Sequence, residues 1–476
     1  MDGLDVVVVG AGIGGLGTAL GLARAGHRVT LLERDDTPMP PDPEAAFAEW
    51  HRRGAPQVRH PHVFFGLGRA ILRDRFPDVL QGLTDLGIVP PPPQPGNGPF
   101  ALDEATLAVI EADQDLRMLP VRRTTFEWVM RGAVLAEEGI DFRQGVAVAG
   151  LELKATADGP PAVTGVRLED GTVLSADLVV ATTGRRSAVP TWLGAHGITI
   201  SETEIDAGVI YFSRFYRGED EYGFGFRAAL NAGLGVGVIG SDACTYSITA
   251  VIDRSDKELR RHLSDSARFD ATMALLPEIE DVVAAGGTPI QEVHSMTGLV
   301  NRTRSFTGSG GDPLVRGFVA VGDAHTCTNP AYGRGQSLAL KQAVMLVDAV
   351  AEVDDLLDAA RAYEARSEAE IVPWYHFSVM TDQMRAAAVA RGDIRPGSPG
   401  SGDPFAALFA GGADPETIRL LLRVMNLLEL PMALLAKLPE LQARAAANPP
   451  PPRPDTGTGA PKRKRPTRAD LLAAGT

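Results

Sequence analysis

The clearest chemical signal of the chain is a glycine-rich segment close to the N-terminus. It reads Gly10-Ala11-Gly12-Ile13-Gly14-Gly15, follows the apolar run 4–9 and opens a helical pattern over 16–25. A second apolar run over 28–33 ends in Glu33. Free amides at a helix N-terminus bind a diphosphate, and an acidic residue after the next strand accepts hydrogen bonds from ribose hydroxyls. The order of these features predicts a strand–helix–strand unit that binds a dinucleotide.

Three glycines of this segment have separate predicted tasks. Gly10 permits the tight turn after the strand, Gly12 lets the backbone approach the diphosphate, and Gly15 allows the helix to pack closely on the strand. The alternative is a glycine-rich turn without a ligand. The strand before it, the helix after it and the acidic residue that follows together favour the ligand.

Three later segments favour FAD over NAD as the dinucleotide. Arg123-Thr124-Thr125-Phe126 opens a predicted helix, and the apolar strand that starts at Asp177 ends in Gly184-Arg185-Arg186-Ser187. Gly322-Asp323-Ala324-His325 ends another strand, where the carboxylate suits ribityl hydroxyls. The turn Pro330-Ala331-Tyr332-Gly333-Arg334-Gly335 leads into a helix. The N-terminus of that helix would stabilise the negative charge of a reduced flavin.

With these motifs, the chain resembles the class A flavoprotein monooxygenases, the para-hydroxybenzoate-hydroxylase-like FAD enzymes, over residues 4–350. The segment Gly54-Ala55-Pro56-Gln57-Val58-Arg59-His60-Pro61-His62 is similar to actinobacterial tailoring enzymes, including the polyether epoxidases. The resemblance implies an enzyme whose reduced FAD forms a C4a-hydroperoxide with O₂ and hydroxylates or epoxidises an apolar organic molecule, as in antibiotic biosynthesis. The residues assigned to FAD are Gly10, Gly12, Ile13, Gly14, Gly15, Glu33, Arg34, Arg123, Gly184, Gly322, Asp323, Pro330, Gly333 and Gly335.

The chain departs from the family pattern in its middle motif. The family usually has Asp-Gly where this chain has Thr183-Gly184, and that motif is associated with both flavin and NADPH contacts. Direct reduction by NADPH or NADH stays open, since Arg185 or Arg186 could bind the NADPH 2′-phosphate. The missing carboxylate favours the alternative, in which reduced flavin comes from a separate reductase. Ser337 and Gln342 also replace an Asn and an Asp that are common in the last helix.

Three histidines are the candidates for proton transfer. His60, His62 and His325 could donate or shuttle a proton near neutral pH, although a structural hydrogen bond is favoured for each. Because the flavin carries the chemistry, the main tasks of the protein are to orient the substrate and to exclude water. Cys327 is expected to be a small buried hydrophobe. Two cysteines cannot build a four-thiolate zinc site, and we expect no metal.

Aromatic residues gather in the predicted substrate sheet, where residues 205–252 alternate like antiparallel strands. Core packing explains most of them, and some could line a pocket for an apolar small molecule. The cluster consists of Tyr211, Phe212, Phe215, Tyr216, Tyr222, Phe224 and Phe226.

Three other functions stay open. A flavin-dependent halogenase would share the scaffold, but the chain has no Trp-x-Trp-x-Ile-Pro segment and no well-placed lysine. A reductase of the prenyl-chain type would share it too. A non-catalytic protein that has lost its cofactor is disfavoured by the intact Glu33 and Gly322-Asp323.

Composition disfavours several further classes. The 476 residues include 46 Lys+Arg and 60 Asp+Glu, a net charge of −14, which makes nucleic acid a poor partner. No apolar run is long enough to span a membrane, and the N-terminus lacks the basic segment of a signal peptide. With only two cysteines, these features predict a cytoplasmic protein.

The predicted fold class is α/β: a Rossmann-type FAD-binding domain (GR2-like) with an inserted antiparallel-sheet substrate domain and a C-terminal helical region. The Pro-rich end of the chain is expected to be disordered. The predicted ranges are 1–195 and 296–355 for the FAD-binding domain, with a loop insertion at 36–100 that is irregular over 36–62, then 196–295 for the substrate domain, 356–447 for the helical region and 448–476 for the tail.

Overall fold

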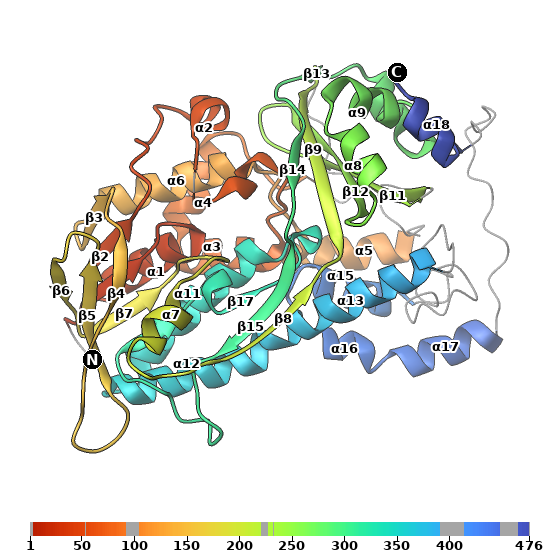
Figure 1. Ribbon diagram of the computed structural model, residues 1–476. Helices are drawn as coiled ribbons and strands as arrows, with labels where there is room; N and C mark the ends of the chain where they lie inside the picture. Colours follow the sequence, from red (N-terminus) through yellow and green to blue (C-terminus); the bar gives the residue numbers. More distant parts are fainter. Residues whose placement is uncertain are drawn as a thin grey trace.

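The computed structural model describes residues 3–52, 54–91, 104–219, 227–231, 233–390, 414–447 and 465–475. Its centre is a five-stranded sheet in the order β16–β7–β1–β2–β3 (Figure 1). All neighbouring strands in this sheet are parallel. Short apolar runs form its central strands because both faces of the sheet are covered. The strands are β1 (Asp5–Val9), β2 (Arg28–Glu33), β3 (Ile140–Gln144), β7 (Leu178–Ala181) and β16 (Phe318–Ala320).

Different layers cover the two faces of the parallel sheet. Val6 and Val8 point into a core shared with helices α1, α6 and α11, whereas Val7 and Val9 pack against a small antiparallel sheet and α7. Neighbours enter different cores because side chains alternate along a strand. The covering elements are α1 (Ile13–Arg24), α6 (Arg123–Ala136), α11 (Gly335–Glu352), α7 (Val189–Gly194), β4 (Val148–Lys154), β5 (Ala162–Leu168) and β6 (Val173–Ser175).

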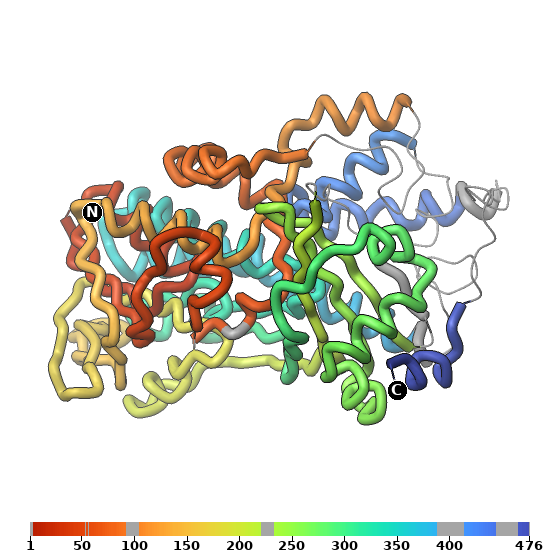
Figure 2. Tube along the Cα trace, turned by 90° about the horizontal axis from the view of Figure 1, so that it is seen from above, coloured from red at the N-terminus to blue at the C-terminus, as the bar shows by residue number. Residues whose placement is uncertain are grey.

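A second, antiparallel sheet lies to one side of the first (Figures 1 and 2). Its strand order is β10–β11–β12–β9–β13, and β14 also pairs with β9. Helices α8, α9 and α10 bury one face of this sheet in a core of its own. The elements are β9 (Val209–Arg217), β10 (Arg227–Asn231), β11 (Leu234–Gly240), β12 (Thr245–Asp253), β13 (Thr288–Pro289), β14 (His294–Met296), α8 (Lys257–Leu263), α9 (Ser266–Met273), the 3₁₀ turn Pro277–Ile279 and α10 (Glu280–Ala284).

A three-stranded sheet joins the two parts. Strand β8 (Ser201–Asp206) leads toward the antiparallel sheet, and β15 (Val300–Ser305) returns beside it as its antiparallel partner. Strand β15 also pairs with β17 (Thr326–Cys327), which follows the parallel strand β16 along the chain. The antiparallel sheet is therefore inserted into the parallel-sheet unit, and the predicted fold class is confirmed.

The predicted loop insertion contains helices as well as loops. Helix α2 (Pro43–Glu49) lies within the stretch expected to be irregular. It forms because Asp42 caps it by accepting a hydrogen bond from the Ala45 amide at 2.8 Å, and because proline is favoured in a first helical turn. Residues 92–100 of the insertion lie outside the described residues. The other elements here are the 3₁₀ turn Pro56–Arg59, α3 (Gly66–Arg75), α4 (Pro77–Asp85), α5 (Glu104–Ala112) and the 3₁₀ turn Gln114–Leu116.

Helices follow α11 along the chain, as the sequence predicts. Helices α12 and α13 succeed one another along one side of the molecule (Figure 1). None of the helices within the described ranges is long and apolar enough to cross a membrane. The bounds are α12 (Leu356–Glu370), α13 (Val372–Ala390), α15 (Pro415–Met425), α16 (Pro431–Leu435) and α17 (Leu438–Ala447).

The end of the chain differs from the expected disordered tail. Residues Arg468–Ala473 form helix α18, and Leu471 is fully buried in the core of the antiparallel-sheet part. Arg468 pairs with Asp256 at 2.8 Å. The prediction was wrong for residues 465–475 because composition describes only the segment itself, whereas a preformed core elsewhere in the chain covers its apolar side chain. Residues 448–464 lie outside the described residues.

Candidate cofactor and active site

The turn between β1 and α1 combines tight packing with open space. Gly10 has a φ of +106°, and a Cβ atom there would lie 2.7 Å from the Thr182 carbonyl oxygen. A Cβ on Gly15 would lie 1.8 Å from the Gly10 carbonyl oxygen. Among the described residues, a Cβ on Gly12 would meet no atom within 4 Å, and no side chain caps α1. The free amides of α1 therefore face room for a ligand, while Ile13 and Gly14 are buried.

Glu33 closes the other side of this turn. Its carboxylate accepts hydrogen bonds from the Ala11 amide at 3.1 Å and from the Asp35 amide at 3.0 Å. These two bonds fix the carboxylate beside the start of α1, where a ribose that follows the diphosphate would lie. The neighbouring Arg34 is exposed, and its guanidinium lies 3.9 Å from a Cβ built on Gly54. The structure thus brings Glu33 to the turn and leaves Arg34 at the surface.

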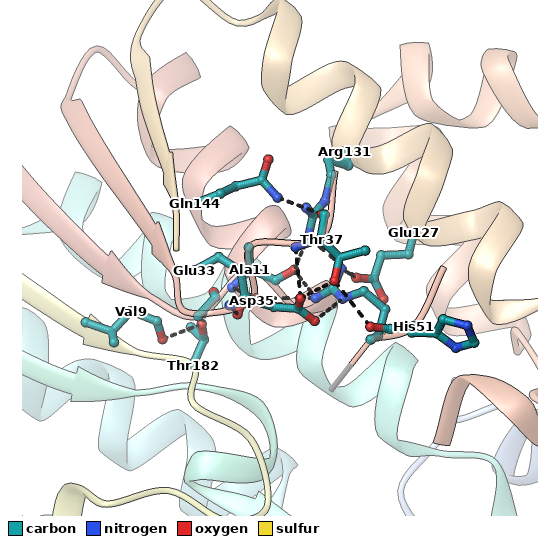
Figure 3. A network of polar contacts seen from close by, with 12 residues as sticks. Val9, Ala11, Glu33, Asp35, Thr37, His51, Glu127, Arg131, Gln144 and Thr182 are labelled. Carbon is teal, nitrogen blue, oxygen red and sulfur yellow. Dashed lines mark hydrogen bonds and ion pairs between the residues drawn. The ribbon is translucent and has the colours of Figure 1, made fainter. Parts of the chain in front are cut away.

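A buried ionic cluster lies next to Glu33 (Figure 3). Arg52 forms ion pairs with Glu33 at 3.3 Å, with Asp35 at 3.8 Å and with Glu127. Arg123 donates to Glu127 at 3.2 Å from one turn earlier in α6. Burial opposes ionisation of Glu127, but the surrounding guanidinium groups hold its pKa below the usual value. The cluster ties the insertion, β2 and α6 together around the nucleotide side of the site.

The sequence did not single out most of this cluster. Besides Arg123, it contains Arg131, whose guanidinium lies 4.9 Å from the centre of the Trp50 ring, and Arg52, which lies 5.1 Å from the same ring. Burial lowers the pKa of Arg131 to about 10. One local signal was present in the sequence: Arg123, Glu127 and Arg131 are spaced four residues apart, which places them on one face of a helix.

Asp323 and the N-terminus of α11 meet at the opposite end of the site. A Cβ on Gly335 would lie 3.8 Å from the Asp323 Oδ1, and no side chain in the described ranges caps α11. Burial raises the pKa of the Asp323 carboxyl, against the opposing charges of Arg185 and Arg123. Gly333 has a φ of +65° in the turn before α11. A carboxylate and free helix amides are thus directed to one place.

The remaining residues assigned to FAD lie close to these groups or at the surface. Gly322 has a φ of +67°, and its amide donates to the Gln342 side chain at 2.8 Å. Gly184 has a φ of +71° and open space around its Cβ position. Pro330 is exposed at the start of the turn that leads to Gly333. Positive φ angles explain why glycine occupies these turns, since other residues adopt them at a cost.

Two candidate histidines lie between the insertion and the antiparallel sheet. His60 is buried, and its Nδ1 lies 2.9 Å from the Ser213 hydroxyl. His62 donates from Nδ1 to the His60 carbonyl oxygen at 2.9 Å. Burial lowers the pKa of each imidazole to about 3. Both rings are therefore neutral near pH 7, and neither is an imidazolium that could supply a proton.

The third candidate, His325, lies in a structural setting. Its Nδ1 is 2.8 Å from the Thr326 hydroxyl, and its Nε2 is 3.4 Å from a Glu364 carboxylate oxygen. Phe306 and Tyr363 pack against the ring. Both ring nitrogens are thus engaged within the protein. Cys327 is buried, as expected, and burial raises the pKa of its thiol.

The antiparallel sheet turns one face of β9 toward the site. Tyr211 donates to Asn329 at 3.0 Å, Ser213 contacts His60, and the Phe215 ring lies 5.2 Å from the Phe47 ring. Phe212 and Tyr216 point the other way, into the core beneath α8 and α9. The aromatic cluster is therefore divided between two faces, and Tyr222, Phe224 and Phe226 lie outside the described residues.

The two ends of the site fit FAD. Open space at Gly12, beside the uncapped start of α1 and Glu33, suits a diphosphate and a ribose. Asp323 and the uncapped start of α11 suit the ribityl chain and the ring edge that becomes anionic on reduction. Within the described ranges, the side chains form no group of three or more His, Cys, Asp or Glu that could hold a metal ion.

Comparisons with known proteins agree with this geometry. Residues 5–40 match the family described as FAD dependent oxidoreductase. PqsL, a probable FAD-dependent monooxygenase from Pseudomonas aeruginosa, superimposes with a TM-score of 0.59 at 16% identity and covers 82% of this chain and 97% of its own. This chain has the fold of FAD-dependent monooxygenases.

Two further solved structures share the fold. HpxO of Klebsiella pneumoniae, solved in complex with FAD, gives a TM-score of 0.57 at 17% identity and covers 93% of this chain and 99% of its own. The flavin-dependent brominase Bmp2 gives 0.60 at 16% identity over the same shares of the two chains, 93% and 99%. The comparison with curated proteins found no match.

Proposed function

We propose that this protein is an FAD-dependent monooxygenase that hydroxylates or epoxidises an apolar organic molecule. The observation that carries the proposal is the placement of two uncapped helix N-termini, each beside a carboxylate, at the two ends of one site. The fold that holds them is shared with FAD-dependent monooxygenases. Bound and reduced FAD would activate O₂, and the protein would orient the substrate and exclude water from the site.

The residues would hold FAD as follows. The free amides at the start of α1 would bind the diphosphate, and Glu33 would accept from the ribose hydroxyls. Asp323 would accept from the ribityl chain, and the free amides at the start of α11 would stabilise negative charge on the reduced ring. Arg123 lies between the two ends, since its charge acts on both His62 and Asp323. The division into a cofactor part (1–195 and 296–355) and a substrate part (196–295) belongs to this proposal.

The antiparallel sheet supports an apolar substrate. Tyr211 of β9 lies on the sheet face that is turned toward the site. The strand register places Val251 and Thr249 of β12 on the same face, and beside them Gly235 and Gly237 of β11. These four residues are partly exposed, whereas the opposite face of the sheet is fully buried in its core. A patch with two glycines and no charge leaves room for a ligand and offers it few polar groups. A natural product is the substrate class that we propose.

We propose that none of the three histidines acts as a proton donor. His60 and His62 are held neutral by burial, and His325 is bonded at both ring nitrogens. Their tasks are to hold the insertion against the antiparallel sheet and to exclude water from the site. Such structural tasks are expected of side chains in an enzyme whose cofactor carries out the chemistry.

We propose a separate flavin reductase as the electron donor. Thr183 donates to the Ser187 hydroxyl at 2.6 Å, Arg185 donates to the Gly298 carbonyl oxygen at 3.3 Å, and Arg186 is exposed. This segment lacks the family carboxylate, and Arg185 already has a partner within the chain. Rapid bleaching of the flavin by NADPH alone would contradict the proposal. If bleaching were then slower in Arg185→Ala or Arg186→Ala, the replaced arginine would be assigned to the NADPH 2′-phosphate.

Labelled oxygen tests the monooxygenase proposal. The purified protein, reduced anaerobically by NADH, by NADPH or by a flavin reductase with its donor, is mixed with ¹⁸O₂ and a panel of lipophilic compounds. We expect a product that contains one ¹⁸O atom per molecule. Product oxygen that comes from water, or a reduced double bond without added oxygen, would contradict the proposal; the second result would assign the reductase function.

A halogenase is the second candidate, favoured by the likeness to a brominase. The same reaction with added bromide or chloride distinguishes the two. A halogenated product that forms only with the halide present would assign this function. A halogenase would need a free lysine amine near the flavin. Lys341, the lysine of α11, does not offer one, because its amine pairs with Glu370 at 2.6 Å.

A further inference from the structure

The strongest unassigned feature is a buried carboxylate on α13, outside the segment that carries the family resemblance. Asp382 accepts hydrogen bonds from the Asn301 amide group at 2.7 Å, the Asn329 amide group at 2.8 Å and the Tyr332 hydroxyl at 2.8 Å. Arg385 adds a fourth, longer contact at 3.4 Å. Asp382 is 6% exposed, so these donors come from protein and not from bulk water.

Hydrogen bonds fix the orientation of the side-chain amide groups of Asn301 and Asn329. The Asn301 Oδ1 accepts from the Asn329 backbone amide at 2.8 Å. The Asn329 Oδ1 accepts from the Ala331 amide at 3.1 Å and from the Tyr211 hydroxyl at 3.0 Å. Each side-chain NH₂ group must therefore point at Asp382. A carboxylate accepts all these bonds, whereas an asparagine at this position would place one NH₂ group against another.

The network reaches both halves of the site. Tyr211 belongs to the site-facing side of β9, and Asn329 and Tyr332 belong to the turn that leads into α11. Burial raises the pKa of both phenols above the usual value, so both remain hydrogen-bond donors. The path Tyr211–Asn329–Asp382–Tyr332 thus joins the antiparallel sheet to the turn expected to hold the flavin ring.

A second contact fixes the same turn to the same helix. Arg334 is buried and lies 4.6 Å from the Tyr332 ring, 5.2 Å from the Trp374 ring and 4.9 Å from the Phe377 ring. It donates to the Ser378 hydroxyl at 2.7 Å. Ser378 and Asp382 are four residues apart and therefore share one face of α13. That face holds the turn at two points.

We propose that Asp382 is a positioning residue that sets the flavin-holding turn 329–334 relative to the substrate-facing side of β9. The inference rests on the proposed function, because it assigns a task to the turn that would carry FAD. Loss of the Asp382 carboxylate would release the Tyr332 hydroxyl and the Asn329 side chain together. The polar groups of the turn would then be oriented differently toward the flavin ring, while the diphosphate end of the site would stay intact.

The test compares Asp382→Asn with Thr381→Ala in the full chain. Thr381 is the next residue of α13 and donates to the Phe377 carbonyl oxygen within the helix, so its variant leaves the network in place. We expect Asp382→Asn to bind FAD about tenfold more weakly, with a shifted visible absorption spectrum. Thr381→Ala should match the wild type in affinity and spectrum.

Conservative variants keep the test valid if Asp382→Asn does not fold. Tyr332→Phe and Tyr211→Phe each retain the ring and remove one hydroxyl of the network. Each should weaken FAD binding and shift the flavin spectrum relative to the wild type, and where Asp382→Asn folds, their effects should be less than additive with it. Unchanged affinity and spectrum in all three, with only a lower melting temperature, would show a merely structural role and overturn the inference.

Failure of the proposed function would look different. A wild-type protein that binds FAD but transfers no oxygen leaves the spectral comparison intact and contradicts only the monooxygenase. A wild-type protein that binds no FAD contradicts both, because the turn then has no flavin to position.

Discussion

The two ends of the site are built in different ways. At the nucleotide end, a Cβ on Gly15 would lie 1.8 Å from the Gly10 carbonyl oxygen, and Glu33 accepts from the Ala11 amide at 3.1 Å. At the ring end, Asp382 gathers donors from β15, from the turn before α11 and from its own helix. Backbone geometry over a short stretch forms the first end. Side chains from distant segments form the second.

This difference predicts how each end responds to change. Where backbone atoms define the shape, one added methyl group has no flexible neighbour that could move aside. Where a side-chain network defines it, a single substitution changes donors and acceptors but leaves the chain path in place. Substitutions at the closely packed glycines of the nucleotide end should therefore act on folding in an all-or-none manner, and those at the ring end should be graded.

Gly15→Ala should have the largest effect. Its Cβ would collide with the Gly10 carbonyl oxygen, where no side chain can yield, so α1 could not pack on β1. We expect little folded protein, with or without added FAD, measured by circular dichroism and by soluble yield. A well-folded variant with a normal melting temperature would show that this turn is not as closely packed as described.

A cavity in the antiparallel-sheet part should have a smaller effect that spares the nucleotide end. Leu471 of α18 is fully buried, and Leu471→Ala should lower the free energy of unfolding by about 2–5 kcal/mol. Met432→Ala, at a side chain that is 61% exposed, is the matched control and should change little. Equal melting temperatures for both variants would mean that α18 does not dock in solution.

The free energy of unfolding should depend on pH through His60, which joins the insertion to β9 at the ring end of the site. Its folded pKa of about 3 lies below the unfolded value of 6.5, so the unfolded chain binds more protons between these limits. Stability should fall as the pH drops from 6.5 toward 3, by about 1.4 kcal/mol per pH unit for this residue. Urea unfolding across this range measures the slope.

His60→Asn removes the titrating ring and keeps a polar group for Ser213, so the slope should become shallower. His51→Asn, the same replacement at an exposed histidine, is the control variant. His62 has the same lowered pKa and keeps its own share of the slope in His60→Asn. A slope that is no shallower than in the wild type would contradict the share assigned to His60.

The sequence indicated the geometry of the nucleotide end because its signals are contiguous, while the assignment of these residues to FAD stays a prediction. Gly10, Gly12, Gly15 and Glu33 lie within one strand–helix–strand unit, and local geometry alone determines their arrangement. Asp323 could also be predicted, since it ends an apolar strand just before a glycine-rich turn. The same reasoning explains why the α/β fold class was predictable from apolar runs and their order.

The ring end and the tail were less predictable. Asp382 is one acidic residue in a helical stretch, and only the fold reveals that Asn301, Asn329 and Tyr332 point at it. Leu471 was assigned to a disordered, Pro-rich tail because the core that covers it is some two hundred residues away in the chain. Neither the partner of a buried polar group nor the cover of a short helix is encoded locally.

Titration of the apoprotein with FAD tests the central claim most directly. Gly12→Ala is compared with Gly132→Ala, because a Cβ at either position meets no atom of the described part of the chain within 4 Å. Both variants should fold like the wild type, since the added methyl group finds open space. Gly132→Ala should bind FAD normally, whereas Gly12→Ala should lose at least about 100-fold in affinity because its Cβ occupies the place of the diphosphate. Wild-type affinity in Gly12→Ala would contradict the placement of FAD at the start of α1.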